Sequence, residues 1–467
     1  MKSNANWVVF GPGLSALVLA ERLGSAGRNV VLLNPGKFWG GIFGGLKIGD
    51  AMFDAGMTNF EFDLFGEPAD DIQAYQPDRK SDIGKYVHFV RDYLGRFAQV
   101  HPLSAPRMAY QGQITGDMVI SNQFDVLQVL PQAQRESIRR ELETIVARPN
   151  PLHPHLKSGA GSLLETTSFE TVSQANHGVT FHQLFIEPLF QKVLGIPTTE
   201  ITGIFHRNGW APLFYPETLL SQFSPTPQQL KPTLFHYPDD PHFGAFIGRI
   251  TEKVRAMPNV TIVDSVKDAS VDLPRGLIRT AQGEFAFDRL AWGGELAQLH
   301  ARAAITPQPV PGRRASLDLF FLRVKREGVG ERFTVLIDPE DASPFYRVTN
   351  QTVCRGVEAA TQQIILECNS SRWDENDPEK QVLFDTALKR YGIAPKTVIE
   401  CVHKTFAGAL GIPSLAQMSE FISLRSATVQ KFPEVYLMGA SSGYVSVTLN
   451  DHIIQALRIA QAEGVLA

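Results

Sequence analysis

Small residues near the start of the chain have the types and spacing of a loop that binds phosphate. Gly11 and Gly13 follow a short apolar run, and Ala16 lies three positions further on. Gly11 permits a tight turn, and Gly13 has no Cβ, so the backbone can approach an anion closely. Ala16 permits close packing of a helix on the preceding strand. Because the free N–H groups of a helix N-terminus attract anions, we expect Leu14 and Ser15 to border a diphosphate.

The elements around this loop make the prediction more specific. An apolar strand over residues 7–10 precedes it, residues 16–23 have helical periodicity, and residues 30–33 form a second apolar run. A lone glycine motif is a weak signal, but a strand–turn–helix–strand unit around it is typical of a dinucleotide-binding domain. The alternative is an ordinary strand–helix turn.

The composition is that of a globular protein with more than one domain. The 467 residues are 43% hydrophobic and 20% charged. A net charge of −4 gives no reason to expect a nucleic acid as partner. The three cysteines, Cys354, Cys368 and Cys401, form no closely spaced pair, so we expect no zinc or other metal site, no disulfide framework and a cytoplasmic location. We expect no signal peptide and no membrane-spanning segment, which would need about 18 apolar residues.

The motifs of the first 66 residues resemble a known superfamily. Gly11, Asn34 and the pair Gly40-Gly41 are spaced as in the FAD-binding amine oxidases, protoporphyrinogen oxidases, phytoene desaturases and UDP-galactopyranose mutases. The resemblance implies that the backbone of the glycine pair passes close to the cofactor. It also implies that Asn34 bonds the adenosine ribose, where these families normally have Glu. An Asn bond carries no charge, and a charge-assisted hydrogen bond is about twice as strong as a neutral one.

Segments in the middle of the chain are similar to other parts of the same fold. Asp54-Ala-Gly56 resembles the Asp-x-Gly segment beside the flavin, and a hairpin turn is the alternative interpretation. Residues 235–244 resemble a Tyr-Pro-x-Gly-Gly element that introduces a helix, and Val266 falls where the family backbone meets the adenine. Residues 285–292 resemble the strand that returns the chain to the nucleotide domain, and Gly294 then gives a close backbone approach.

A second fingerprint near the end of the chain completes the resemblance. Gly439 follows an apolar run, and Ala440 stands where the family has an acid that bonds the ribityl chain. Leu449 and Asn450 open a last helix, whose N-terminus carries about half a positive charge and is implied to point at the flavin. No flavin-linking Cys or His is recognisable, so the resemblance implies noncovalent FAD.

The predicted fold class is α/β, with a discontinuous Rossmann-like FAD-binding domain and an α+β substrate domain that contains a mostly antiparallel sheet and a helical segment. The runs after residue 314 are rich in β-branched and aromatic residues and alternate as half-buried strands do. The expected boundaries are 1–66, 235–310 and 426–467 for the three parts of the FAD-binding domain, 67–234 for the helical segment and 311–425 for the sheet.

The helical segment contains a Lys-x-x-Gly-x-x-Pro sequence from Lys192 to Pro197, which is similar to a helix end in the oxidase and mutase families. The bulky stripe before it, which includes Phe181 and Phe185, is expected to pack in the core. We expect Lys192 itself to be a solvated or capping residue and not a catalytic one.

Candidates for substrate contact are few, because a flavin performs its own redox chemistry and asks the protein mainly for binding and orientation. The chain shows no Ser/His/Asp pattern, metal-spaced histidines or phosphate-binding P-loop. The candidate catalytic residues are Tyr346, Arg347, Lys404 and Arg207. Arg347 could hold a carboxylate or phosphate through two hydrogen bonds, and the alternative is a surface Arg on an edge strand. His403 is expected to be a surface or structural residue.

Three functions remain open on the sequence. The first is an FAD-dependent oxidoreductase, that is, an oxidase, dehydrogenase or desaturase, which takes a hydride from a C–N or C–C bond of a small molecule. The second is a mutase similar to the UDP-galactopyranose enzymes, acting on a nucleotide sugar and motivated by the segment around Lys192 and Trp210. The third is a non-catalytic relative with weakened flavin binding, motivated by Asn34 and Ala440. The sequence leaves the oligomeric state open.

Overall fold

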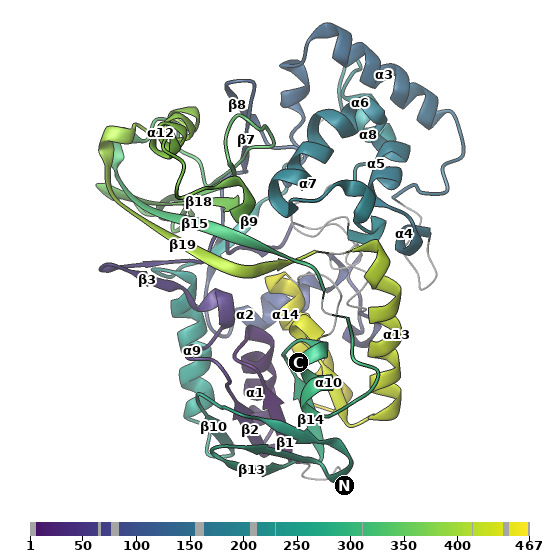
Figure 1. The fold of residues 1–467 in the computed structure, drawn as a ribbon, viewed down its shortest axis with the longest axis vertical. Coiled ribbons are helices and arrows are strands. Elements are labelled where there is room, and N and C mark those ends of the chain that lie inside the picture. The colour runs from purple at the N-terminus through teal and green to yellow at the C-terminus, as the bar shows by residue number, and fades with distance from the viewer. Residues whose placement is uncertain are drawn as a thin grey trace.

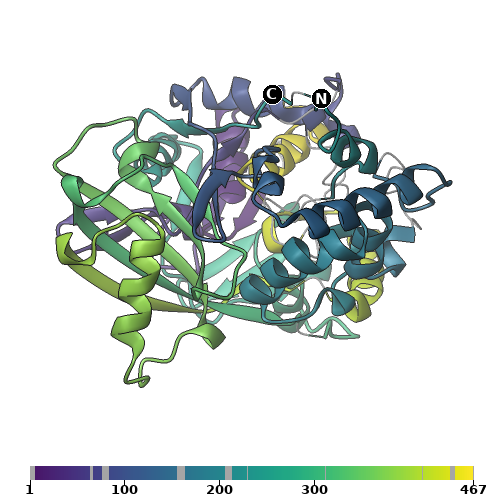
Figure 2. The same cartoon turned by 90° about the horizontal axis from the view of Figure 1, so that it is seen from above.

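The computed structural model describes residues 6–63, 67–75, 84–154, 163–205, 213–228, 230–310, 312–412, 414–441 and 448–465. These residues form a parallel sheet flanked by helices, a larger mixed sheet and a group of helices (Figure 1). Seen from above, the mixed sheet and the group of helices lie side by side (Figure 2). The predicted α/β class is confirmed at this level.

Five parallel strands form the sheet at the bottom of Figure 1, in the order β10-β2-β1-β14-β20. Their bounds are β1 Trp7–Phe10, β2 Val30–Leu33, β10 Val260–Val263, β14 Arg289–Trp292 and β20 Val435–Leu437. β1 is buried along its whole length, as expected for a central strand with both faces covered. The sheet therefore combines strands from the start, the middle and the end of the chain.

Helices and a small sheet cover the two faces of the parallel sheet. On one face, α1 Leu14–Ser25 contacts both α9 Phe243–Arg255 and α14 Leu449–Ala462 (Figure 1). On the other face, α10 Leu296–Arg302 lies near a three-stranded sheet. Its strands are β11 Ser270–Asp272, β12 Leu277–Thr280 and β13 Gly283–Ala286. Apolar side chains from these elements pack against Phe10 and Trp292, so the sheet is buried on both sides.

The single strand predicted over residues 285–292 is wrong. Residues 283–286 form β13, which pairs antiparallel with β12, and the parallel strand β14 begins at Arg289. Between the two, the Phe287 N–H donates to the Gly276 carbonyl and the Asp288 N–H donates to the Asn6 carbonyl. The chain changes its hydrogen-bond partner, and therefore its sheet, at this point.

The mixed sheet has seven strands in the order β19-β15-β18-β17-β16-β7-β8. Their bounds are β7 Arg107–Tyr110, β8 Gln113–Gly116, β15 Arg314–Lys325, β16 Val335–Ile337, β17 Phe345–Asn350, β18 Thr361–Asn369 and β19 Val398–Gly411. Neighbouring strands are antiparallel except for β16 and β7. α12 Lys380–Arg390 covers one face, where Phe384 packs on Phe320. Strands β7 and β8 were not predicted, because four residues are too few to show a period.

The group of helices at the top right of Figure 1 follows β8 in the chain. It comprises α3 Gln132–Val146, α4 Leu163–Thr166, α5 Phe169–His177, α6 Val179–Phe181, α7 Glu187–Leu194 and α8 Pro216–Ser221. The predicted packing of the bulky stripe is confirmed, because Phe181 and Phe185 are buried in one hydrophobic cluster with residues of the mixed sheet.

The other elements link these three parts. They are β3 Leu46–Ile48, β4 Ala51–Phe53, β5 Phe60–Glu61, α2 Val87–Leu94, β6 Val100–Pro102, β9 Phe235–Pro238, α11 Gln351–Cys354 and α13 Leu415–Lys431. α13 was not predicted, and the boundary expected at residue 425 lies within it. The domain boundaries stay a prediction. Within the described ranges, no helix is both long and apolar enough to span a bilayer.

Asp54 connects the early part of the chain to α9. Its carboxylate accepts hydrogen bonds from the Tyr237 hydroxyl at 2.6 Å and from the backbone N–H of Phe243 at 2.9 Å, which opens α9. The hairpin-turn interpretation of this segment is wrong, because it links β4 to β5, which belong to different sheets. Burial raises the pKa of Asp54 to about 6, against the opposing effect of the two hydrogen bonds.

The raised pKa of Asp54 gives a testable dependence of stability on pH. Between the unfolded pKa of about 4 and the folded value, the native protein retains a proton that the unfolded chain releases. The contribution of Asp54 to the free energy of unfolding is fully present below that window and falls as the pH rises through it. We expect the unfolding free energy of the wild type to fall by about 3 kcal/mol between about pH 4 and 6, and Asp54→Asn to remove this fall. Urea unfolding at each pH measures both proteins. The exposed Asp92→Asn is the control, and a wild-type profile that is flat in this window would contradict the prediction.

Candidate functional site

Three glycines from distant parts of the chain meet where the strands of the parallel sheet end. A Cβ on Gly11, which has φ +136°, would lie 3.4 Å from the Cα of Gly293. A Cβ on Gly293 would lie 3.0 Å from the Phe10 carbonyl oxygen, and one on Gly439, with φ +59°, would lie 3.4 Å from the Gly293 carbonyl oxygen. The turns after β1, β14 and β20 therefore lie close together, tightest at Gly293, and the positive φ angles of Gly11 and Gly439 also favour glycine.

Gly13 has a different environment from these packed glycines. It is the N-cap of α1, no side chain caps this helix end, and a Cβ at this position would meet no atom within 4 Å. The loop of Gly40 and Gly41 lies beside it, since the Gly40 N–H donates to the Pro12 carbonyl at 2.7 Å. The helix N-terminus is thus open, with a backbone of positive φ at both Gly40 and Gly41 next to it.

This open helix end borders a cavity of about 610 Å³. Five residues expected to bind a cofactor line it, namely Gly13, Leu14, Gly40, Gly41 and Ala440. The other walls come from α10, from the start of β15, from the end of β19 and from α13, and include Arg313, Arg314 and Phe421. The volume lies within the range of about 300–1,000 Å³ that is usual for small-molecule and cofactor sites.

Asn34 and Val266 are not among the residues that line this cavity. Asn34 is fully buried, its Oδ1 accepts from the Gly36 N–H at 2.8 Å, and its Nδ2 donates to Asp264 at 3.3 Å. The Val266 N–H donates to the Asn34 carbonyl at 2.8 Å. The Asn34 side chain thus stabilises the turn after β2 in this structure.

The remaining predicted cofactor residues also have structural contacts. The Asn450 amide donates to the Glu61 carbonyl at 2.6 Å and so joins α14 to β5, and the adjacent Leu449 is buried. The Gly439 N–H donates to Gln455 at 2.7 Å. A Cβ on Gly294 would lie 3.0 Å from the Trp292 ring nitrogen. Gly11 and Ala16 are packed in the interior, behind the open helix end.

Ser15 leads to a cavity residue that was not predicted. Its hydroxyl lies 2.7 Å from Nδ1 of His452, and His452 lines the cavity from the first turn of α14. The sequence signal that could have indicated it is its place two residues after Asn450, at the helix end already expected to face the cofactor.

Tyr346 and Arg347 are held by a buried carboxylate. Arg347 donates two hydrogen bonds of 2.6 Å to Glu367, and the Tyr346 hydroxyl donates to the same group at 3.3 Å. The Arg347 side chain is 12% exposed and Glu367 is 2% exposed. Burial alone would lower the pKa of Arg347, but Glu367 raises it above its usual value. The alternative of a surface Arg on an edge strand is wrong, because β17 lies between β16 and β18.

Glu367 also holds the Asp-x-Gly segment. It accepts from the Met57 N–H at 3.2 Å, and a Cβ on Gly56 would lie 2.8 Å from its carboxylate. The other two candidates are not brought to this cluster: Lys404 is exposed on the edge strand β19, and Arg207 lies outside the described residues. His403 stacks on Phe320 with ring centroids 4.5 Å apart, in agreement with a structural role.

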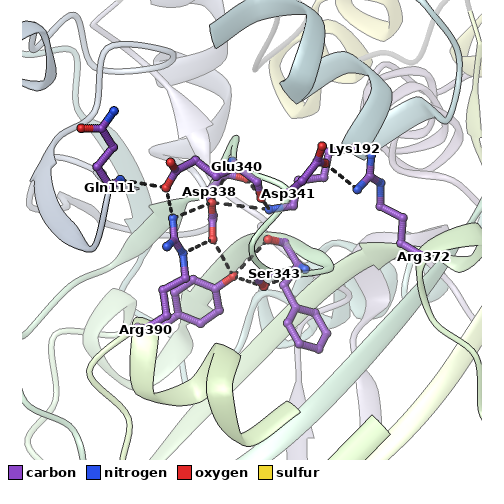
Figure 3. Close-up of polar contacts among 10 residues, drawn as sticks. Gln111, Lys192, Asp338, Glu340, Asp341, Ser343, Arg372 and Arg390 are labelled. Carbon is purple, nitrogen blue, oxygen red and sulfur yellow. Dashed lines mark hydrogen bonds and ion pairs between the residues drawn. The ribbon is translucent and has the colours of Figure 1, made fainter. Parts of the chain in front are cut away.

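Lys192 is buried, so the expectation of a solvated side chain is wrong. Its Nζ donates to the Asp338 carbonyl at 2.9 Å and to the Glu340 carbonyl, and lies 3.4 Å from the Asp338 carboxylate (Figure 3). Arg390 also donates to Asp338, at 2.7 Å. Burial lowers the pKa of Lys192 to about 8, against the opposing effect of Asp338. A charge so buried needs partners of this kind, and here they join α7 to the loop before β17.

Solved structures with the same fold include three that carry the names of enzymes in the superfamily that the sequence resembles. Reduced UDP-galactopyranose mutase aligns with a TM-score of 0.72 and 18% identity, over 98% of this chain and 94% of that chain. A protein from Exiguobacterium sp. 255-15 with a provisional assignment as a protoporphyrinogen oxidase aligns with a TM-score of 0.66 and 14% identity, over 99% of both chains. Putrescine oxidase bound to putrescine aligns with a TM-score of 0.63 and 12% identity, over 98% of both chains.

The resemblance is therefore confirmed at the level of the fold, and at these identities the likeness concerns the fold alone. No family model and no curated protein sequence matches the chain. Among the described residues, no group of three or more His, Cys, Asp or Glu side chains is placed to hold a metal ion.

The pair of Arg347 and Glu367 gives a second testable outcome. Arg347→Ala leaves a buried carboxylate without its cation, which costs about 3–5 kcal/mol of unfolding free energy. The control is Arg332→Ala, which breaks an exposed pair with Glu358 and should cost at most about 1 kcal/mol. The double variant Arg347→Met/Glu367→Leu removes both buried charges, so it should lose less unfolding free energy than Arg347→Ala. Equal costs for Arg347→Ala and Arg332→Ala in urea unfolding would show that the buried pair does not stabilise the sheet.

Proposed function

We propose that this chain is an FAD-dependent oxidoreductase that takes a hydride from a C–N or C–C bond of a small molecule. The observation that carries the proposal is the uncapped N-terminus of α1, which opens between Gly13 and the Gly40-Gly41 loop into a cavity of cofactor size. FAD, when bound, supplies the hydride acceptor, so the protein needs to provide binding, orientation and exclusion of water.

The residues at the cavity fit a flavin dinucleotide. The α1 N-terminus offers N–H groups and a partial positive charge to a diphosphate, and the absence of a side chain on Gly13 leaves room for its close approach. Ala440 is exposed to the cavity and leaves space where the family has an acid. We propose noncovalent binding, with the hydroxyl groups of the cofactor held without the two carboxylates that the superfamily uses.

The apolar part of the lining supports hydride transfer from a small substrate. Its side chains belong to several segments and include Leu14, Phe43, Leu296, Phe421 and Leu424. Such a lining excludes water from the transfer and holds an apolar substrate skeleton. We further propose that the enzyme is cytoplasmic, which the three free cysteines support.

A mutase that acts on a nucleotide sugar is the second candidate. It is favoured by Arg313 and Arg314, which line the cavity and could hold a substrate diphosphate, although each now pairs with a glutamate. The two reactions differ in their need for reduced flavin. Anaerobic loss of the oxidised-flavin absorbance on adding a panel of amines supports the oxidoreductase. Ring contraction of a nucleotide sugar only by dithionite-reduced protein supports the mutase.

A variant at Gly13 tests the cofactor site directly. Its backbone has φ −74° and a Cβ would meet no atom within 4 Å, so Gly13→Ala should fold normally. Its methyl group should nevertheless stand where the diphosphate approaches, and we expect FAD affinity to fall about tenfold or more, which corresponds to about 1.4 kcal/mol. Gly248→Ala on α9, where a Cβ also meets no atom within 4 Å, is the matched control. Titration calorimetry measures both, and unchanged affinity in Gly13→Ala would argue against this site.

Variants at Ala440 distinguish between two proposed functions, an active flavoenzyme and a non-catalytic relative with weakened flavin binding. We expect Ala440→Asp to tighten FAD binding by about tenfold, because a carboxylate forms a charge-assisted hydrogen bond to a ribityl hydroxyl. Ala440→Ser, which can form only a neutral bond, should have a smaller effect. If the wild type binds FAD only weakly and Ala440→Asp binds it tightly, the result supports the non-catalytic relative over the active flavoenzyme.

A further inference from the structure

His452 is held in a fixed position at the cavity by two contacts. Its Nδ1 lies 2.7 Å from the Ser15 hydroxyl, and its ring meets the Phe43 ring nearly edge-on, with centroids 5.4 Å apart and an interplanar angle of 79°. Ser15 belongs to the first turn of α1, and Phe43 follows the Gly40-Gly41 loop. The imidazole is therefore oriented by both segments that border the open helix end.

The position of the imidazole relative to α1 indicates which part of a ligand it meets. The backbone of Gly13 and Leu14 forms the open N-terminus of α1, and Ser15 follows directly after them. Gly13, Leu14 and His452 line the cavity. An anion bound by the first N–H groups of α1 would thus lie next to the imidazole. We propose that His452 is a binding residue for the diphosphate of the dinucleotide, an inference that rests on the FAD site proposed above.

The other charges around the cavity are already balanced or have the wrong sign. Arg313 pairs with Glu200 and Arg314 pairs with Glu295. Glu420 also lines the cavity and would repel an anion. His452 adds an imidazole from the first turn of α14, whose N-terminus is itself capped by Thr448 and Asp451. A ring N–H that donates to an anionic phosphate forms a charge-assisted bond, which would add affinity where Asn34 and Ala440 supply no carboxylate for the cofactor hydroxyls.

Binding of three ligands to His452→Ala tests this assignment by titration calorimetry. The ligands are FAD, ADP, which contains the diphosphate without the flavin, and riboflavin, which contains the flavin without the diphosphate. We expect His452→Ala to weaken FAD and ADP by about tenfold or more and to leave riboflavin unchanged. His452→Gln keeps an amide group with N–H donors, so it should fold like the wild type and lose less affinity than His452→Ala. Ser15→Ala should lose less, because the imidazole remains.

Each outcome of this experiment decides one question. Unchanged FAD and ADP affinity in a folded His452→Ala overturns the inference and leaves the proposed function intact. Equal losses for riboflavin and ADP also overturn it, because a diphosphate contact cannot weaken riboflavin. A wild type that binds neither FAD nor ADP overturns the proposed function itself. Unfolding midpoints of the three variants separate lost contacts from lost structure.

Discussion

The close approach of three backbones, at Gly11, Gly293 and Gly439, is the constraint on which the rest of the structure depends. Each turn follows a strand of the parallel sheet; a side chain at Gly293 would crowd the Phe10 carbonyl, and Gly11 and Gly439 have positive φ angles that side chains disfavour. α1 and α14 begin after two of these turns, and because the strands are parallel, their N-termini lie at the same edge of the sheet. The cavity opens at this edge, bordered by Gly13 and His452.

The second organising feature is the way in which buried charges are satisfied at the joints between the parts. Glu367 holds Arg347 and the Asp-x-Gly segment, and Asp338 holds Lys192 and Arg390. Each of these charged groups lies between elements that are distant in sequence. Removing one partner leaves the other charged in a poorly solvated place, so each joint depends on both partners.

The sequence predicted the features that local patterns control. The glycine loop, the apolar strands and the last helix can be recognised from a few adjacent residues, and Gly13, Gly40 and Ala440 do line one cavity. The sequence did not predict features that depend on tertiary contacts. Lys192 looks like a helix-end lysine until the loop of Asp338 covers it, and Arg347 looks like an anion binder until Glu367 from the neighbouring strand neutralises it. Few residues of the helix α13 are buried, so its apolar residues do not recur clearly at helical spacing and the sequence did not predict it.

The arrangement of the parallel sheet also sets an order of events for the growing chain. β10 and β14 follow β1 and β2 by more than two hundred residues, and β20 comes later still. Pairings between such distant segments form slowly, because the entropy of closing long loops must be overcome first. The edges of the β1–β2 pair therefore stay open while the intervening residues are synthesised. β1 acquires its neighbour β14, and α1 its neighbour α14, only after several hundred further residues.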